Sequence, residues 1–298
     1  MATVIADLHG KSVDLAAKDG WRTLKNRIMS GLLLGSFIVV MLPLAFVLYA
    51  VISRGAKVMG WSFLTKDIAP IERNRGGGVG PAIIGTIVVT AVATAMATPL
   101  GIMGAIYLHE YGGKGTFAKL VRFLANVMTG VPSVVMGLFV YVAYTLHFKQ
   151  RGLGGSLALA CLMLPIIIRT TEEMLKLVPN YLREASLALG TTKARTILTV
   201  VLPAALPGVV SGILLAVSRA AGETAPLLFT IGAAKALQLN PFAEAPMTAL
   251  PFQIYANANS SFPAAQARGW GAAFTLVALA FVFTLLARLI SARFATKR

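Results

Sequence analysis

Residues 169–203 have the sequence RTTEEMLKLVPNYLREASLALGTTKARTILTVVLP, a polar interruption in a mostly apolar chain. The pattern in its middle is helical, because Leu182, Ala185, Ser186 and Leu189 follow the i, i+3, i+4, i+7 spacing of one helix face. That face is apolar to small, and charged residues lie on either side of it. The segment therefore predicts a short amphipathic helix rather than a membrane span.

Both ends of this helix are marked in the sequence. Pro179 suits the first turn of a helix, and Gly190 fits the left-handed position that follows a helix end. Thr191 or Thr192 can cap the next helix, and Pro203 stands where the following apolar run opens. The segment is predicted to form two short helices that meet at a glycine elbow.

Composition outside this segment indicates a membrane protein. Hydrophobic residues make up 57% of the 298 residues and charged residues only 13%, with a mean hydropathy of +0.76. A soluble domain carries about 25% charged residues, and a disordered chain is poor in apolar residues. The net charge of +16 does not indicate nucleic-acid binding, because such binding is not paired with this hydropathy. The single cysteine, Cys161, excludes an intrachain disulfide.

The apolar runs are long enough to cross a bilayer, whose core takes about 20 helical residues. The first run has no charge before Arg54, and it is longer than the apolar region of a signal peptide, which has about 7–15 residues. Six spans are predicted, over residues 31–53, 81–108, 121–146, 153–168, 204–231 and 270–290. Residues 1–30 then form an N-terminal segment, and residues 54–80 form the first loop between spans.

The distribution of basic residues predicts the orientation. If the N-terminus is inside, 17 of the 27 Lys and Arg residues lie in inner segments and nine lie in outer ones. The positive-inside rule then places both termini in the cytoplasm. The outer segments 54–80 and 232–269 are large enough to receive a soluble partner, or they serve only to cap the helices.

The polar segment carries a family signature. It resembles the EAA loop of the type I permeases of ABC importers, which reads E-A-A, three residues, G, nine residues and I-x-L-P. The matching residues are Glu184, Ala185, Ser186, Gly190, Val200, Leu202 and Pro203. This chain departs at Ser186, where the pattern has Ala, and at Val200, where it has Ile. In that family the loop is the coupling helix that docks in a cleft of the ATPase subunit.

Three further runs resemble the phosphate-importer permeases: GVPSVVMGLF at 130–139, LPIIIRTTEE at 164–173 and RAAGETAPLLFT at 219–230. The last run is closer to the PstA branch of that family than to the sister PstC branch. The resemblance covers about residues 60–295, and residues 1–30 match nothing. It implies an all-α integral membrane protein of six spans with an ABC transmembrane type-1 core over residues 81–298.

The resemblance also implies partners and a location. These are a PstC-like permease, two PstB-like ATPases that bind ATP and Mg²⁺, and a phosphate-binding protein on the outer face. The location is the bacterial plasma (inner) membrane. No cofactor is implied for this chain itself.

Arg219 and Glu223 are the most informative charges, because they share a helix face at i, i+4 within the fifth predicted span. An arginine near the middle of a span costs about 2.5–3.5 kcal/mol and normally faces a bundle interior or an aqueous path. A guanidinium matches phosphate with two parallel hydrogen bonds. Arg219 is predicted to line the path, with Glu223 keeping anion binding weak. A purely structural ion pair, or a role for Glu223 in deterring monoanions, are the alternatives.

Three more residues are assigned to the path. Arg169 follows the fourth predicted span and can form the inner exit or act as an ordinary positive anchor. Ser133 and Thr224 can donate hydrogen bonds to phosphate, although most such residues bond their own helix backbone.

Catalytic patterns are missing, so the chain is predicted not to be an enzyme. Gly10-Lys11-Ser12 ends like a phosphate-binding loop, but Ile5 replaces the required first glycine. The three histidines are scattered, and no nucleophile–base set is apparent. The alternatives are a permease for molybdate or sulfate, the sister PstC subunit, and a secondary transporter in which Glu223 carries a proton. An ion-driven carrier has no ATPase to dock, which argues against the last of these.

Overall fold

A computed structural model describes residues 20–295 apart from Arg75 and Lys114. The chain divides into a first unit that ends at Ala50 and a second unit, Val51–Arg298. The first unit contributes most of helix α1 (Gly20–Gly55). This helix begins before the predicted start at residue 31, because Trp21, Leu24 and Ile28 continue without a helix-breaking residue. Most of the predicted N-terminal segment, residues 1–19, lies outside the described residues.

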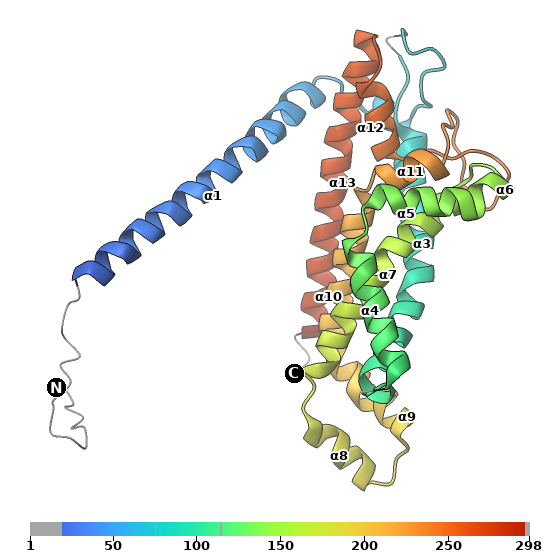
Figure 1. The fold of residues 1–298 in the computed structure, drawn as a ribbon. Helices are drawn as coiled ribbons and strands as arrows, with labels where there is room; N and C mark the ends of the chain where they lie inside the picture. Colours follow the sequence, from blue (N-terminus) through green and yellow to red (C-terminus); the bar gives the residue numbers. More distant parts are fainter. Residues whose placement is uncertain (1–19, 75, 114, 296–298) are drawn as a thin grey trace. The chain divides into compact units, whose positions relative to one another are not determined.

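The second unit is a helical bundle, and no strand occurs among the described residues (Figure 1). Its long helices are α3 (Gly80–Ile106), α7 (Gly152–Lys176), α10 (Leu202–Ala221) and α13 (Pro263–Ala295). With α1, five helical segments are long and apolar enough to cross a membrane, and the number rises to six if a bent pair forms one span. The prediction of an all-α protein with six spans agrees with this count.

The third predicted span, 121–146, is not one straight helix. It consists of α4 (Thr116–Gly130), α5 (Ser133–Val140), the π-helical segment η2 (Tyr141–Thr145) and α6 (Leu146–Phe148). The halves are bent by 109° at residues 131–132. Pro132 causes the break, because a proline forces the preceding residue out of the helical region. Val131 accordingly has an extended backbone, with ψ of 129°.

The fifth predicted span, 204–231, is also broken. Helix α10 ends at Ala221, and α11 (Ala225–Thr230) begins after Gly222, Glu223 and Thr224. Pro226 lies in the first turn of α11, where its missing N–H costs nothing. Within a continuous helix the same ring would clash with the carbonyl of residue 222. The prediction of one continuous helix over residues 204–231 is therefore wrong, because the helix ends between Arg219 and Glu223.

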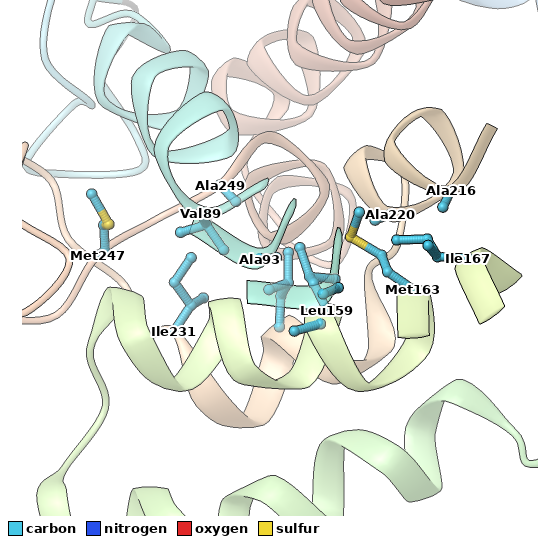
Figure 2. Close-up of a cluster of buried hydrophobic side chains, with 13 residues drawn as sticks. Val89, Ala93, Leu159, Met163, Ile167, Ala216, Ala220, Ile231, Met247 and Ala249 are labelled. Atoms are coloured by element: carbon cyan, nitrogen blue, oxygen red, sulfur yellow. The ribbon is translucent and has the colours of Figure 1, made fainter. Parts of the chain in front are cut away.

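The core is built on close packing of small residues. Helix α3 has small or β-branched residues at every fourth position, and they are buried: Gly85, Val89, Ala93, Ala97, Gly101 and Ala105. Small residues allow membrane helices to approach closely. A methyl group added at Gly101 would lie 2.6 Å from Ile167 Cγ2 of α7. Figure 2 shows the resulting cluster, which joins α3 and α7 to Ala216 and Ala220 of α10.

The segment predicted as a second outer loop, 232–269, contains more structure than expected. It returns to the bundle at Met247 and then forms α12 (Leu250–Ala258), after which α13 begins at Pro263 rather than residue 270. The Leu250 N–H donates to Thr86 Oγ1 of α3 at 2.8 Å. The buried hydroxyl of Thr86 thus satisfies a backbone donor where the returning segment meets α3.

The polar segment forms the predicted elbow. Helix α7 extends past the expected end at residue 168 to Lys176, and α8 (Asn180–Ala188) follows Pro179 and projects beyond the bundle (Figure 1). Gly190 has φ of +80°, as expected for a left-handed helix end. Thr192 caps the short α9 (Lys193–Thr196) through its side chain. A π-helical segment, η3 (Ile197–Val201), leads from α9 into α10.

Candidate anion path and docking helix

Arg219 and Glu223 form an ion pair at the break after α10. Arg219 Nε lies 3.5 Å from Glu223 Oε1, and the two side chains are 60% and 19% exposed. Arg219 is in the last turn of α10, whereas Glu223 lies beyond the helix end. The pair is therefore formed as predicted, but at a helix terminus and not within a continuous helix.

The Arg219 side chain is exposed, although it lies on α10 between buried residues. Its neighbours Ala216 and Ala220 are buried in the cluster that also contains Met163 of α7 (Figure 2). The C-terminal turn of a helix carries partial negative charge from its free carbonyl groups, which stabilises a cation there. Arg219 thus has local stabilisation at the helix end and remains accessible to an anion.

Ser133 and Thr224 lie close to the two helix breaks. Ser133 is the first residue of α5, and Thr224 directly precedes α11. The two short helices pack together where Gly137 faces Pro226, with room for no side chain at Gly137. The Thr224 hydroxyl makes no capping hydrogen bond to α11. Their assignment as phosphate donors stays a prediction.

Arg169 lies at a different level of the bundle, near the end that carries α8. It lines a cavity of about 210 Å³ between α4 and α7. Its guanidinium contacts Glu173 Oε1 at 3.4 Å and Asn126 Oδ1 at 3.3 Å, and its side chain is 62% exposed. Thr170 faces Gly212 of α10. Arg219 is seven residues further along α10, which corresponds to about 10 Å. Arg169 and Arg219 therefore do not form one binding site.

The same cavity contains charges that sequence reasoning did not select. Arg122 of α4 donates from Nε to Glu172 Oε1 at 3.0 Å, and Lys176 Nζ lies 3.6 Å from the same oxygen. Glu172 is mostly buried, whereas Glu173 and Arg169 are exposed. The i, i+4 spacing of Glu172 and Lys176 was the one signal available in the sequence. Three cations and two carboxylates line this end of the cavity.

The residues of the EAA-like signature divide into exposed and buried groups. Glu184 and Ala185 are exposed on α8, and the apolar Tyr181 and Leu189 beside them are 66% and 85% exposed. Ser186 is buried. Leu202 and Pro203 form the first turn of α10.

The Ser186 hydroxyl holds the elbow together. It lies 2.8 Å from Thr191 Oγ1 and 2.9 Å from Thr196 Oγ1, and these two threonine hydroxyls are 2.9 Å apart. Thr191 Oγ1 also donates to the Ser186 carbonyl at 2.7 Å. A serine at this position, where the family pattern has alanine, thus links both arms of the elbow.

The loops at the opposite end of the bundle are joined to each other. Arg268 is 5% exposed, and its guanidinium donates to the carbonyls of Glu72, Asn74 and Gly76. Lys235 Nζ donates to the Pro70 carbonyl at 2.7 Å. The two predicted outer segments therefore form a single surface.

The sequence of this chain is similar to those of known transport proteins. The sequence model of the family described as "Binding-protein-dependent transport system inner membrane component" matches residues 97–296. "Phosphate transport system permease protein PstA 1" of Mycobacterium tuberculosis (strain CDC 1551 / Oshkosh) is 41% identical over 275 residues, which are 90% of this chain and 89% of the relative. "Phosphate transport system permease protein PstA" of Yersinia pestis is 40% identical over 279 residues, 93% of each chain.

Two solved structures share the fold. A bacterial alginate ABC transporter, in complex with an alginate pentasaccharide-bound periplasmic protein, gives a TM-score of 0.66 at 14% identity, over 92% of this chain and 97% of that chain. The inward-facing MetNI methionine ABC transporter gives a TM-score of 0.58 at 18% identity, over 73% of this chain and 94% of that chain. Similarity at these identities establishes the fold alone.

Proposed function

This chain belongs to the binding-protein-dependent transport system inner membrane components, and within them to the PstA phosphate transport permeases, and we propose that it forms half of the translocation path of an ATP-driven phosphate importer. It is a multi-pass protein of the inner membrane with the type I ABC-importer permease fold. It is a transport subunit and not an enzyme, because ATP hydrolysis in this family lies in a separate subunit.

The observation that carries the phosphate assignment beyond the relatives' names is the accessible guanidinium of Arg219. A planar guanidinium can hold two phosphate oxygens at once and keeps its charge at any physiological pH. Glu223, 3.5 Å away, offsets part of that charge. Phosphate would therefore bind weakly enough to leave, as conduction requires.

The second half of the path is assigned to a PstC-like permease. The Arg219 side chain is 60% exposed within its own chain, so a partner subunit can complete the wall of the path beside it. Ser133 and Thr224, at the nearby helix breaks, are assigned as hydrogen-bond donors to the passing anion. Non-helical backbone at membrane depth is tolerated where it lines a cavity, which is consistent with these breaks.

Arg169 is assigned to the inner exit of the path. The cavity that it lines has an excess of cationic over anionic side chains, so an anion is attracted there as well. With Arg169 about 10 Å from the level of Arg219 along the bundle, phosphate would pass from one cation to the next. The carboxylates of Glu172 and Glu173 limit how tightly phosphate is held at Arg169.

The elbow built on α8 is assigned to ATPase docking. Its exposed residues Glu184, Ala185, Tyr181 and Leu189 offer a helix face to a partner groove. Gly190, Ser186, Leu202 and Pro203 set the direction of that face and connect it to α10. Two PstB-like subunits bind ATP and Mg²⁺, and one of them docks on this chain, which binds no cofactor of its own.

The orientation follows from the same assignment. The α8 end faces the cytoplasm, in agreement with the excess of basic residues in the segments predicted to be inside. The joined outer loops then face the periplasm or the exterior, where a phosphate-binding protein docks. Exposed Trp61, Leu239 and Phe242 give that surface apolar contact area.

The test is phosphate uptake by the assembled complex reconstituted in vesicles, with Arg219→Gln, Glu223→Gln and the double variant. Loss of one charge-assisted hydrogen bond predicts that Arg219→Gln lowers uptake by about tenfold or more. A path role predicts that the double variant stays inactive, because it still lacks the cation. Lys57→Gln, at an exposed basic residue between α1 and α2 (Trp61–Thr65), is the matched control.

A structural ion pair predicts the opposite result. Losing Arg219 would then strand Glu223, and the double variant would recover uptake per assembled complex. Uptake of sulfate or molybdate in place of phosphate by the unaltered complex would contradict the choice of substrate, but not the fold.

A further inference from the structure

The docking elbow is tied to the rest of the bundle through one buried ion pair. Arg183 of α8 contacts Glu110 Oε1 from Nη2 at 3.0 Å and from Nε at 3.2 Å. The two side chains are only 14% and 8% exposed. They are 73 positions apart in the sequence. The pair therefore joins the loop after α7 to the helix that begins at Gly80.

Arg183 is held from a second direction by the end of α7. Its Nη1 donates to the Val178 carbonyl at 2.7 Å and lies 3.3 Å from Asn180 Oδ1. Its Nη2 donates to the Leu175 carbonyl at 3.0 Å. The last carbonyls of a helix lack donors within the helix. Arg183 donates to one of them, that of Leu175, and to the Val178 carbonyl just beyond the helix end. One guanidinium thus connects α8, the end of α7 and Glu110.

The other arm of the elbow reaches the same residue. Lys193, the first residue of α9, donates from Nζ to the backbone carbonyl of Glu110. Its ammonium group also lies 4.7 Å from the centre of the Tyr111 ring. Gly190 separates Arg183 from Lys193 in the sequence. The two arms of the elbow, α8 and α9, are consequently both anchored at Glu110.

Glu110 belongs to a backbone segment of unusual geometry. The segment η1 (Tyr107–Tyr111) is π-helical and directly continues α3. Single π-helical turns are rare and occur frequently at functional sites. The buried stripe of α3 leaves little space for adjustment: a side chain at Gly85 would meet the backbone of Thr248, and one at Gly101 would meet Ile167 of α7. A displacement of Glu110 would therefore act on a helix that is closely packed along its length.

We propose that Arg183 and Glu110 pass the displacement of the docking elbow to α3, with Arg183 as the positioning residue and Lys193 as a second tether. The inference rests on the proposed function, because it requires an ATPase that moves α8. Energy released by ATP hydrolysis then reaches α3 through Glu110 as well as reaching α10 through the covalent chain at Pro203. If Glu110 is released, the elbow still docks, but hydrolysis no longer drives transport efficiently.

The experiment measures ATP hydrolysed per phosphate transported by the reconstituted complex carrying Glu110→Gln, Arg183→Gln or both. The ratio is expected to rise about fivefold or more in each single variant, the lower end of the range for coupling between sites. It should stay raised in the double variant. Lys119→Gln, an exposed lysine of α4 with no side-chain partner among residues 20–74, 76–113 and 115–295, should keep the ordinary ratio.

A merely stabilising pair gives a different pattern. It predicts less assembled complex in the single variants, an unchanged ratio in whatever complex assembles, and recovery of assembly in the double variant, where no charge is stranded. An unchanged ratio in all three variants would overturn the proposal. If the single variants do not assemble, Lys193→Gln and Arg183→Lys provide the measurement, since neither strands a charge. If both of these variants leave the ratio of ATP hydrolysed to phosphate transported unchanged, the proposal is overturned as well.

Failure of the proposed function is recognised separately. The unaltered complex would then hydrolyse ATP without taking up phosphate at all. A normal unaltered complex with normal ratios in every variant would contradict only the role of Arg183 and Glu110.

Discussion

The glycine at the elbow offers a sharp test of the docking assignment, because its effect can be worked from backbone geometry alone. Gly190 has φ of +80°, and a side chain added there would meet nothing within 4 Å among the described residues. Space within the chain is therefore not the obstacle to substitution. The obstacle is the left-handed backbone, which costs an L-residue about 1–2 kcal/mol and costs a β-branched residue more.

Gly190→Val is expected to relieve this strain by rotating the backbone at residue 190. That rotation would pull Thr191 away from Ser186 and Thr196 and would change the direction of Glu184. A cost of at least about 1–2 kcal/mol lowers the population of the native elbow by roughly five- to thirtyfold or more. Phosphate uptake per assembled complex should fall by a similar factor, with membrane insertion unchanged.

Gly190→Asn is the matched variant. Asparagine is similar to valine in size, but it tolerates the left-handed region far better. It should therefore keep most of the uptake that Gly190→Val loses. The assay is phosphate uptake in vesicles, normalised to the permease recovered in the membrane and to the ATPase that co-purifies with it.

Two outcomes would refute the reasoning. Normal uptake in Gly190→Val would show that the elbow geometry does not matter for coupling. An equal loss in Gly190→Asn would mean that any side chain at residue 190 obstructs the ATPase, so the backbone explanation would be wrong.

Two further predictions concern packing. Gly101→Ala should lower the Tm of the purified protein, because the new methyl group would lie 2.6 Å from Ile167 Cγ2 and such overpacking costs about 1–3 kcal/mol. Gly104→Ala is the control: its methyl group would meet Ile168 at 3.5 Å, so the Tm should stay unchanged or rise. Equal Tm values would contradict the close approach of α3 and α7. Thr86→Val should cost about 1–3 kcal/mol by leaving the buried Leu250 N–H without a partner. Thr94→Val removes a hydroxyl that donates to the Thr90 carbonyl of its own helix, so it should cost less, and thermal unfolding of both variants is the measurement.

Local chemistry explains why the elbow could be predicted. The backbone favours one kind of residue at each of three positions: a proline before α8, a glycine with positive φ after it, and a threonine that caps α9. Such requirements do not depend on distant parts of the chain. The prediction therefore agreed with the structure at Gly190 and Thr192, whereas Pro179 is the N-cap of α8 and not part of its first turn.

The two broken spans show where hydropathy misleads. Val131 at the first break is as apolar as the helices beside it, and the second break, Gly222 to Thr224, adds one charge to an apolar run that resumes at Ala225, so neither break ends its run. Hydropathy reports the surroundings of a residue and not its backbone hydrogen bonds. Pro132 and Pro226 carried the missing information, and Gly130 and Gly222 precede them by a few residues. A proline a few residues after a glycine in an apolar run is a usable indication of a broken span.

The contacts that link Glu110 to Arg183, and Arg122 to Glu172, could not be obtained from the sequence. Each joins residues at least 50 positions apart, and no local spacing relates them. They depend on the packing of α4 and α7 and on the return of α8 beneath α3. The sequence indicated that the residues were charged and lay between spans, which is also true of many residues without partners.

The break after α10 changes the physical argument for Arg219. In a continuous membrane helix its charge would cost about 2.5–3.5 kcal/mol. At the helix end the free carbonyls of the last turn stabilise a cation by about 0.3–1 kcal/mol. Those carbonyls alone would repel phosphate, because they carry partial negative charge. Under the proposed function, the guanidinium of Arg219 at this break offsets that repulsion, so we expect it to favour the approach of an anion. The break that makes the arginine tolerable in the membrane is therefore consistent with the role in anion passage that we propose for it.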